Sequence, residues 1–551
     1  MTGKAFSRYL LVIGIAVSLI FAAMIAVIIY FATRNCEDMT EKFKQPTTAA
    51  IKFMDPLEHF RVKDGLEINI FKAVNTKEDL RRSQDGNFHI IQTYITMSQT
   101  EKREPVTETS SGTPVPLSDW LDTVLQTDKG IQIHFLTAEA ITPAIQIINE
   151  RRMQLQRPVF LGGNVMSKDG QNEINVKRFI ELASLIPDVT LSFGFDTNDE
   201  PCGIGTLQTL WNLVEKLMQP INIRVPVHIL KKSWARVKWL TEKSERITVT
   251  IFEKENSVQE SSYEYDLLLV RNDFSRRRLY FDLPESRLQK LRKLAVTAGR
   301  AIDFFDLQDA SKIIWSHATN TKEKLRDALQ GHTMMIEADI LLQAQGTMNQ
   351  TNVPVMSHPP SVYSDLTFEE WIDTILPIKN KGVKLDFKSL EAVEPTLSIL
   401  NRRRLLVNCP VWINADILQG PNGPPVIMKA DVFLQYCLKL FPEATLSLGW
   451  TTGAKKENET PVYTREQMTE IHQICKNLNQ PVTFPVRAAF VRDSWEHLDW
   501  LLQQSRGYTL TVWTSGLDTV KKADMDFIYR QTENHRIYFD LPNELMPDSI
   551  F

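Results

Sequence analysis

Two periodicities of apolar residues alternate along most of the chain. Short apolar or β-branched runs, typical of buried strands, are separated by stretches in which apolar residues recur every three or four positions, as in helices. In the C-terminal half these runs predict eight strands, within KIIW, TMMIEADI, GVKLDF, LLVNCPVWINA, ATLSLGW, VTFPV, YTLTVW and RIYFDL. Strands that alternate with helices pair in parallel, and eight such units in about 250 residues have the size of a (β/α)8 barrel.

The N-terminal half repeats this pattern. DWLDTVL at Asp119 recurs as EWIDTIL at Glu370, and RLYFDLP at Arg278 recurs as RIYFDLP at Arg536, among other pairs in the same order. A period of about 250 residues indicates a duplicated domain. We therefore predict an α/β protein with two tandem (β/α)8 TIM-type barrels. The first barrel covers residues 56–286, the second covers residues 306–551, and a linker helix over residues 287–305 joins them. A doubly wound open sheet is the alternative, although no GxGxxG motif follows a first strand.

The N-terminal region has a different composition. Leu10 to Ala32 are 23 residues without a charge, long enough to cross a bilayer as a helix. A cleaved signal peptide, the alternative, has a shorter apolar region and an exit of small residues. We predict an uncleaved signal-anchor helix over 10–32, between a tail (1–9) and a juxtamembrane stalk (33–55). The barrels of this single-pass membrane protein would then be extracellular or lumenal, and the glycosylation sequons at Asn349 and Asn458 agree with that orientation.

Composition excludes some classes of protein. The 43% apolar and 24% charged residues are those of a globular protein, and a net charge of −4 argues against a nucleic-acid partner. The five cysteines form no CxxC pair, so a zinc ribbon is excluded, and they are too few for a disulfide scaffold. One bridge among Cys409, Cys437 and Cys475 stays open.

Unusual polar and aromatic residues gather where the strands of the second copy end, which is where (β/α)8 barrels place their chemistry. They are His317, Glu337, Asp339, His358, Lys384, Asp386, Lys388, Asn414, Asp416, Trp450, Arg487 and Trp513. Glu337 and Asp339 lie two residues apart in the apolar run MMIEADILL, so both face one side of the strand and need a compensating charge. With Asp386 they form a hard oxygen site, and we predict that it binds Mg²⁺ or Ca²⁺.

The other residues fit an anionic substrate. Lys384, Lys388 and Arg487 supply positive charge, and two histidines can serve as acid and base. We predict that the substrate contacts are Lys384, Asn414, Asp416, Trp450, Arg487 and Trp513. Each residue also has a structural interpretation: a single histidine is commonly structural, the tryptophans can be packing residues, and Arg487 can pair with Asp416.

The first copy provides an internal control. In the alignment of the two copies Glu337 falls on Gln92, Asp339 on Tyr94 and Asp386 on His134, whereas the surrounding strand residues agree. Lys384 falls on Gln132 and Arg487 on Pro226. The first copy is therefore predicted to keep the fold and to have lost the chemistry.

The segments WSHATNTKEKL, MMIEADILL, MSHPP, GVKLDFKSLEAV and VWINADILQGP resemble the menorin family, in its two-domain, membrane-anchored form. The resemblance covers essentially all of the second copy and, in degenerate form, the first. It implies barrels of the phospholipase-C-like phosphodiesterase type, similar to glycerophosphodiester phosphodiesterases. That pattern has a histidine after strand 1, E-x-D on strand 2, a second histidine and E-x-K on strand 3.

By this resemblance His317, His358 and Lys388 would be catalytic, and Glu337, Asp339 and Asp386 would bind the metal. This chain departs from the pattern at Ala318, Pro359 and Asp386, which stand where the related enzymes have arginine, an acid and glutamate. The implied activity is metal-assisted cleavage of a small phosphodiester, of glycerophospho- or lysophospholipid type. The alternative is a catalytically inactive cell-surface adhesion or receptor-type protein that binds an extracellular protein partner.

Overall fold

The computed structural model describes residues 54–110, 112–167, 176–196, 202–253, 263–454, 459–516 and 518–548. The predicted signal-anchor helix over 10–32 and the sequon at Asn458 lie outside these ranges. Within them, no helix combines the length and the apolarity that a bilayer crossing needs. The chain divides into two compact units: Phe71–Phe193 and Leu213–Ile221 belong to the first, and Phe60–Ile70, Gly194–Asn212 and Asn222–Phe551 form the second.

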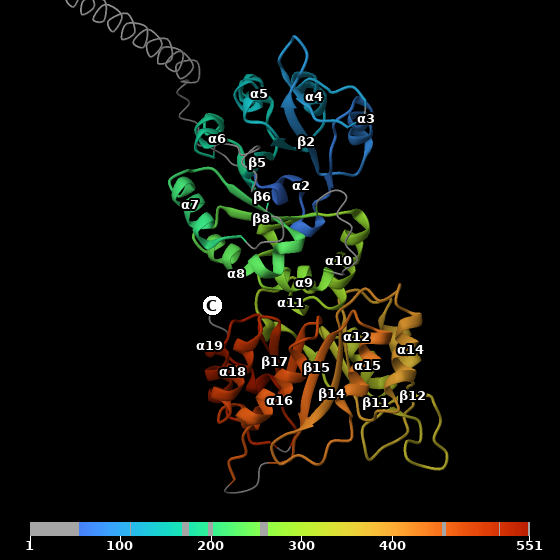
Figure 1. The fold of residues 1–551 in the computed structure, drawn as a ribbon. Coiled ribbons are helices and arrows are strands. Elements are labelled where there is room, and N and C mark those ends of the chain that lie inside the picture. Colours follow the sequence, from blue (N-terminus) through green and yellow to red (C-terminus); the bar gives the residue numbers. More distant parts are fainter. Residues whose placement is uncertain are drawn as a thin grey trace, which may run out of the picture. The chain divides into compact units, whose positions relative to one another are not determined.

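The second barrel lies wholly within the second unit. Its parallel strands pair in chain order: β10 (Trp315–Ser316), β11 (Met335–Leu342), β13 (Gly382–Phe387), β14 (Val411–Gln419), β15 (Thr445–Thr451), β16 (Val482–Arg487), β17 (Tyr508–Trp513) and β18 (Ile537–Asp540). A short strand, β12 (Pro354–Met356), pairs antiparallel with the end of β11. The strands form a nearly closed barrel (Figure 1).

Helices alternate with these strands. They are α12 (Lys322–Gln330), α13 (Phe368–Ile375), α14 (Val393–Arg402), α15 (Ala430–Leu440), α16 (Arg465–Cys475), α17 (Ala488–Val491), α18 (Trp495–Gln504) and α19 (Lys522–Gln531). Thr321 and Thr367 start α12 and α13 by accepting a hydrogen bond from the backbone N–H three residues later, and Thr367 completes a capping box with Glu370. Each such cap stabilises its helix by about 1 kcal/mol. Thr76 caps the matching helix of the first barrel.

The first barrel has the same topology. Its parallel strands are β1 (Ile70–Phe71), β2 (Ile90–Met97), β4 (Gly130–Phe135), β5 (Val159–Ser167), β6 (Thr190–Asp196), β7 (Ile221–Pro226), β8 (Ile247–Phe252) and β9 (Leu279–Asp282), with β3 (Pro105–Thr107) antiparallel to β2. The helices of this region are α2 (Pro56–Phe60), α3 (Lys77–Asp85), α4 (Leu117–Val124), α5 (Ala138–Glu150), α6 (Val176–Ala183), α7 (Ile204–Val214), α8 (Leu230–Thr241) and α9 (Glu264–Asn272). The strand order follows the chain in both sheets, whereas a doubly wound sheet reverses it. The prediction of two barrels is confirmed, and the open-sheet alternative is wrong.

The segment predicted as one linker helix forms two helices, α10 (Glu285–Thr297) and α11 (Ala301–Phe304). The break falls at Gly299, where a Cβ atom would lie 2.0 Å from the carbonyl oxygen of Ala295. Only glycine fits this close approach of the backbone to the end of the helix.

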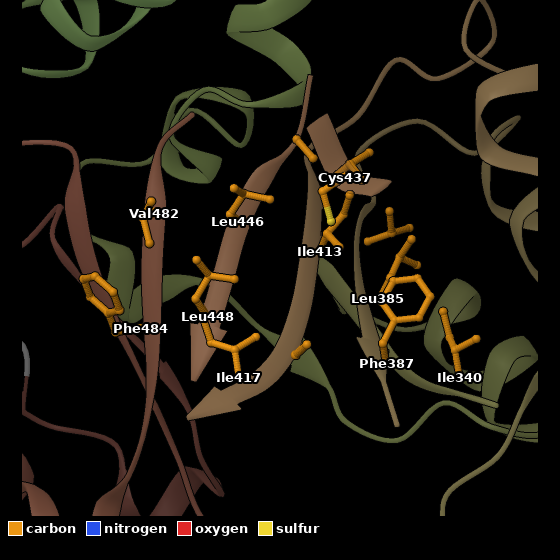
Figure 2. Packing of buried hydrophobic residues seen from close by; sticks show 14 of the residues in the cluster. Ile340, Leu385, Phe387, Ile413, Ile417, Cys437, Leu446, Leu448, Val482 and Phe484 are labelled. Carbon is orange, nitrogen blue, oxygen red and sulfur yellow. The ribbon is translucent and has the colours of Figure 1, made fainter. Parts of the chain in front are cut away.

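Along each strand of the second barrel, alternate side chains point outward to the apolar layer under the helices and inward to the inside of the barrel. Ile340, Leu385, Phe387, Ile413, Ile417, Leu446, Leu448, Val482 and Phe484 belong to one buried apolar cluster, which also contains Cys437 of α15 (Figure 2). The residues between them face the other way, into the barrel. Cys409, Cys437 and Cys475 are separate buried thiols, so the disulfide considered among them does not form.

Near the N-terminal strand ends, aromatic residues fill the interior of the second barrel. Met335, Trp412 and Tyr538 belong to a second buried cluster against which the partly buried Trp315 packs, and the ring centroids of Trp412 and Tyr538 are 5.0 Å apart. This packing resembles the filled interior of a TIM barrel and is not a pore. The polar interior residues lie above it, toward the C-terminal strand ends.

Candidate functional site

Three carboxylates meet at the C-terminal end of the second barrel. Glu337 and Asp339 project inward from β11, and Asp386 projects inward from β13, where it is the register partner of Asp339. One oxygen of each carboxylate lies within 4.8 Å of the other two. The structure thus brings together the three residues that the sequence predicts as metal ligands.

Glu337 is fully buried, and only one of its oxygens has a partner. Oε2 accepts a hydrogen bond of 2.6 Å from the backbone N–H of Ala318, whereas Oε1 has no hydrogen-bond partner among the described residues. Ala318 has a φ of 51°, in the left-handed region that non-glycine residues rarely adopt, and the strained backbone directs its N–H to the carboxylate. Burial raises the pKa of Glu337 to about 7, although the charge of His317 opposes this. A buried acceptor without a partner is expensive, and a cation would satisfy it.

The other two carboxylates share an ammonium group. Lys388 Nζ lies 3.2 Å from Asp339 Oδ1 and 2.7 Å from Asp386 Oδ2. Side-chain amides of Asn320 and Asn414 donate to the remaining oxygens of Asp339 and Asp386, each at 2.7 Å. Burial opposes the charge on Asp386, but Lys388 and Lys384 outweigh it and lower the pKa of this carboxyl. The shared ammonium and the two amides therefore fix the orientation of both side chains.

His317 lies at the mouth of the barrel, with half of its side chain exposed. Its Nδ1 is 3.0 Å from Asp540 Oδ2 and 3.5 Å from Glu337 Oε2. Partial burial opposes protonation of the ring, but Glu337 and Asp540 outweigh it and raise the pKa of His317 to about 9. Because a carboxylate only accepts, Nδ1 carries a proton and Nε2 is the nitrogen available to a ligand.

Asp540 was not predicted from the sequence. It lies in RIYFDLP, which recurs in the first copy, so the comparison of the two copies classed it with the scaffold. The same holds for Asn320, whose segment recurs around Asn75. A polar residue at the inward end of a predicted strand was the signal that could have identified Asp540.

Lys384 is a buried cation without a direct anionic partner. It projects inward from β13 as the register partner of Glu337, and its Nζ lies 5.9 Å from the centroid of the Trp315 ring. Among the described residues it makes no hydrogen bond or ion pair. An ammonium buried in this way favours an anionic ligand.

The charges in the interior do not balance. The described interior carries five carboxylates (Glu337, Asp339, Asp386, Asp416 and Asp540) against two ammonium groups and one imidazole. Two negative charges remain when all of these groups are ionised, and either a divalent cation or protons on Glu337 and Asp416, whose pKa values burial raises to about 7, would restore neutrality. Burial raises the pKa of Asp416 to about 7, and this residue makes no hydrogen bond with described residues. The oxygen donors, their spacing and the charge all fit Mg²⁺ or Ca²⁺.

Two predicted residues make no hydrogen bond or ion pair with the three carboxylates among the described residues. His358 is exposed on the loop after β12, and its Nδ1 lies 2.6 Å from the carbonyl oxygen of Pro359. Trp450 has the outward orientation of Leu446 and Leu448 and packs in the core, with its ring centroid 5.3 Å from that of Tyr463. The structure therefore gives Trp450 a packing position.

Arg487 is held by an acid, but not by the one considered from the sequence. Its guanidinium lies 2.7 Å from Asp518 and donates to the carbonyl of Gly453 and the hydroxyl of Ser515, each at 2.8 Å. Its Cζ is 5.7 Å from the centroid of the Trp513 ring. Arg487 thus fixes the loop after β17 beside Trp513, and Asp518 neutralises its charge.

The first barrel has different residues at the same register positions. Gln92 pairs with Gln132 where the second barrel pairs Glu337 with Lys384, and Tyr94 pairs with His134 where it pairs Asp339 with Asp386. At Gly162, the counterpart of Asn414, a Cβ atom would lie 1.8 Å from the carbonyl oxygen of Ser192. Within the part of the chain that the structure describes, the three-carboxylate cluster occurs only in the second barrel.

Comparisons with known proteins agree with the duplication. The family model described as the menorin N-terminal domain matches residues 64–288 and again residues 309–546. Protein FAM151B of Homo sapiens is 43% identical over 234 residues, which are 42% of this chain and 84% of that protein. Each barrel carries one copy of the menorin N-terminal domain, and the chain belongs to the menorin family.

Proposed function

We propose that the second barrel is a metal-dependent phosphodiesterase, that its substrate is a glycerophospho- or lysophospholipid-like diester, and that the first barrel is catalytically inactive. The observation that carries this proposal is the position of Lys384 beside the carboxylate cluster. A buried ammonium that makes no hydrogen bond or close ion pair with described residues stands beside three carboxylates, one of which has an unpartnered oxygen. A phosphodiester is the kind of anion that such an ammonium and a carboxylate-bound divalent cation would bind together.

Each residue has a defined task in this proposal. A divalent cation held by Glu337, Asp339 and Asp386 would polarise a phosphoryl oxygen and stabilise the developing negative charge. Lys384 binds the anionic oxygens of the diester from inside the barrel. Lys388 bridges Asp339 and Asp386 and fixes their orientation.

Proton transfer falls to the histidines. Asp540 holds Nδ1 of His317, so that Nε2 can exchange a proton with the attacking or the leaving oxygen. His358 on the loop after β12 is the candidate for the second proton transfer, and its Nδ1 is likewise held, by the carbonyl of Pro359. The resemblance of the sequence motifs to glycerophosphodiester phosphodiesterases supports these two roles.

The test is an assay of the full chain on a panel of glycerophosphodiesters and lysophospholipids with Mg²⁺ or Ca²⁺. Lys384→Met, which keeps a long unbranched side chain and removes its charge, is expected to lower turnover by about a hundredfold or more. Gln132→Met, at the matching register position of the first barrel, is the control and should leave turnover unchanged. No turnover on the whole panel, or equal losses in both variants, would refute the proposal.

One observation favours a second candidate, a catalytically inactive cell-surface binding protein. Lys388 bridges Asp339 and Asp386 and already compensates part of their charge. For this candidate we propose an extracellular protein partner, bound without any contribution from the cation site. Partner binding that Glu337→Gln leaves unchanged, together with no turnover, would support it; loss of binding in that variant would refute it.

For both candidates we propose that residues 10–32 anchor the chain and that the barrels face the lumen or the exterior. Asn349 is exposed on the loop between β11 and β12, where a glycan could attach. Treatment of the full chain with an N-glycosidase should then change its mobility on a gel, and Asn349→Gln should reduce that change. A chain without any glycan would argue against this orientation.

A further inference from the structure

One arginine is anchored in the same way in both copies of the domain. Arg278 and Arg536 begin the repeated segments RLYFDLP and RIYFDLP. The carbonyls that accept from Nε and Nη2 are those of Thr241, Ser244 and Ile247 for Arg278, and those of Leu502, Ser505 and Tyr508 for Arg536. These carbonyls occupy corresponding positions, just before or at the start of β8 and β17, so the surroundings of the two guanidinium groups can be compared directly.

The remaining nitrogen, Nη1, has different partners in the two copies. In the first barrel, Nη1 of Arg278 lies 2.6 Å from the carboxylate of Glu245. The residue aligned with Glu245 is Arg506, so the second barrel has a cation where the first has the anion. Nη1 of Arg536 reaches the exposed Glu533 only at 4.0 Å. Among the described residues, Arg536 therefore has no carboxylate as close as the one that Arg278 has.

A small cavity of about 30 Å³ lies at this position, and Arg300, Arg506, His535 and Arg536 line it. Trp412 also lines the cavity; it is 2% exposed, and its Nε1–H has no hydrogen-bond partner among the described residues. Burial and the charges of Arg300 and Arg536 lower the pKa of His535 to about 4, so its ring is neutral at neutral pH. The cavity has room for about two water molecules or for one small anion.

The cations around the cavity outnumber the acids that they share. Asp303 is paired with three cations and Asp273 with two. These cations are Arg271, Arg276 and Arg300, which contact Asp303, and Lys238 and Arg506, which contact Asp273. Arg271 has a second carboxylate, that of Asp64. A positive surplus therefore remains in this network of described residues, and it favours an anion at the cavity.

We propose that this cavity binds one small inorganic anion of the size of chloride, in the place that the carboxylate of Glu245 takes in the first barrel. The guanidinium groups of Arg506 and Arg536 are its charged donors, and the Trp412 N–H is a further donor in the same cavity. A water molecule would accept from these groups but would leave their charge uncompensated. The site lies at the N-terminal strand ends, opposite the carboxylate cluster, so it does not depend on the proposed phosphodiesterase. It makes the stability of the second barrel depend on the anion.

The experiment measures thermal unfolding of the full chain in sodium chloride and in sodium gluconate at equal ionic strength, because gluconate is too large for the cavity. We expect a Tm about 3 °C higher in chloride. Arg506→Glu gives the second barrel the carboxylate of the first, so this variant should lose the difference between the two salts and be stable without chloride. Lys439→Glu makes the same change of charge at an exposed position of α15 and is the control, which should keep the difference.

A second measurement locates the ion. Crystals soaked in sodium bromide should show an anomalous peak beside Arg506 and Arg536, and crystals of Arg506→Glu should show none there. Equal Tm values of the unchanged protein in the two salts overturn the proposal even if a bromide peak appears, because the peak then marks an adventitious ion only. An undiminished effect of chloride on Arg506→Glu also overturns it, since the anion then acts elsewhere on the protein.

Discussion

The two barrels share a backbone and differ in their interiors. Both keep the strand order and a left-handed alanine after the first strand, Ala73 with φ of 50° and Ala318 with φ of 51°. Yet the register pair Glu337 and Lys384 of the second barrel is Gln92 and Gln132 in the first. Acid and base are absent together, since a lone buried charge would cost several kcal/mol. Outward apolar positions therefore fix this fold, whereas interior charges change as compensating sets.

The largest effect is expected when a set of compensating charges in the barrel interior loses one member. Lys388→Leu introduces the residue found at the aligned position Leu136 and leaves Asp339 and Asp386 without their shared ammonium. We expect the free energy of unfolding of the second barrel to fall by about 3 kcal/mol in the presence of a chelator. Denaturant titration followed by intrinsic fluorescence measures it.

Adding Asp339→Asn and Asp386→Asn to Lys388→Leu should restore most of this stability, because the repelling charges are then gone. Adding Mg²⁺ to the single variant should restore part of it, since the cation replaces the ammonium charge. An unchanged denaturation midpoint for Lys388→Leu would show that the aspartates do not depend on it.

The second-largest effect concerns an aspartate that both barrels keep but that has a different partner in each. Asp540 binds His317, whereas its counterpart Asp282 forms a buried ion pair of 2.9 Å with Arg224. Asp540→Asn should lower turnover about 10- to 100-fold, because the neutral amide removes the negative charge that orients His317 and favours its protonated form. Asp282→Asn should leave turnover unchanged and lower the stability of the first barrel. Kinetics and thermal unfolding of both variants separate the two roles; equal kinetic losses would contradict this assignment.

A smaller effect tests whether the register pair is coupled. Glu337→Gln and Lys384→Gln together give the second barrel the pair of the first. In a double-mutant cycle we expect the double variant to be more stable, by about 1 kcal/mol, than the two single losses imply. Strict additivity within about 0.3 kcal/mol would show that these residues do not compensate one another.

Most of the fold could be predicted from local patterns of apolar and polar residues. The alternation that places Leu385 and Phe387 outside and Lys384 and Asp386 inside is visible in GVKLDF, and the duplicated segments gave the two barrels. The carboxylate cluster followed from the same alternation. Trp450 could have been placed too, because it has the spacing of Leu446 and Leu448 and so belongs to the outer face.

Other features depend on contacts distant in the chain. Asp518, the partner of Arg487, lies in a loop with no pattern that marks it, and Asp540 meets His317 only when the barrel brings the last strand near the first. The break of the linker at Gly299 rests on the approach of a Cβ atom to one carbonyl oxygen, which no period of apolar residues encodes. Partners of this kind require the three-dimensional arrangement.

We propose that the interior of the second barrel binds a divalent cation and that the interior of the first does not. Anomalous diffraction from crystals of the protein soaked in Mn²⁺, which binds to the same oxygen ligands as Mg²⁺, tests it directly. We expect one anomalous peak between Glu337, Asp339 and Asp386, and none beside Gln92, Tyr94 and His134. Crystals without a peak at the three carboxylates, in which Lys388 still bridges Asp339 and Asp386, would contradict it.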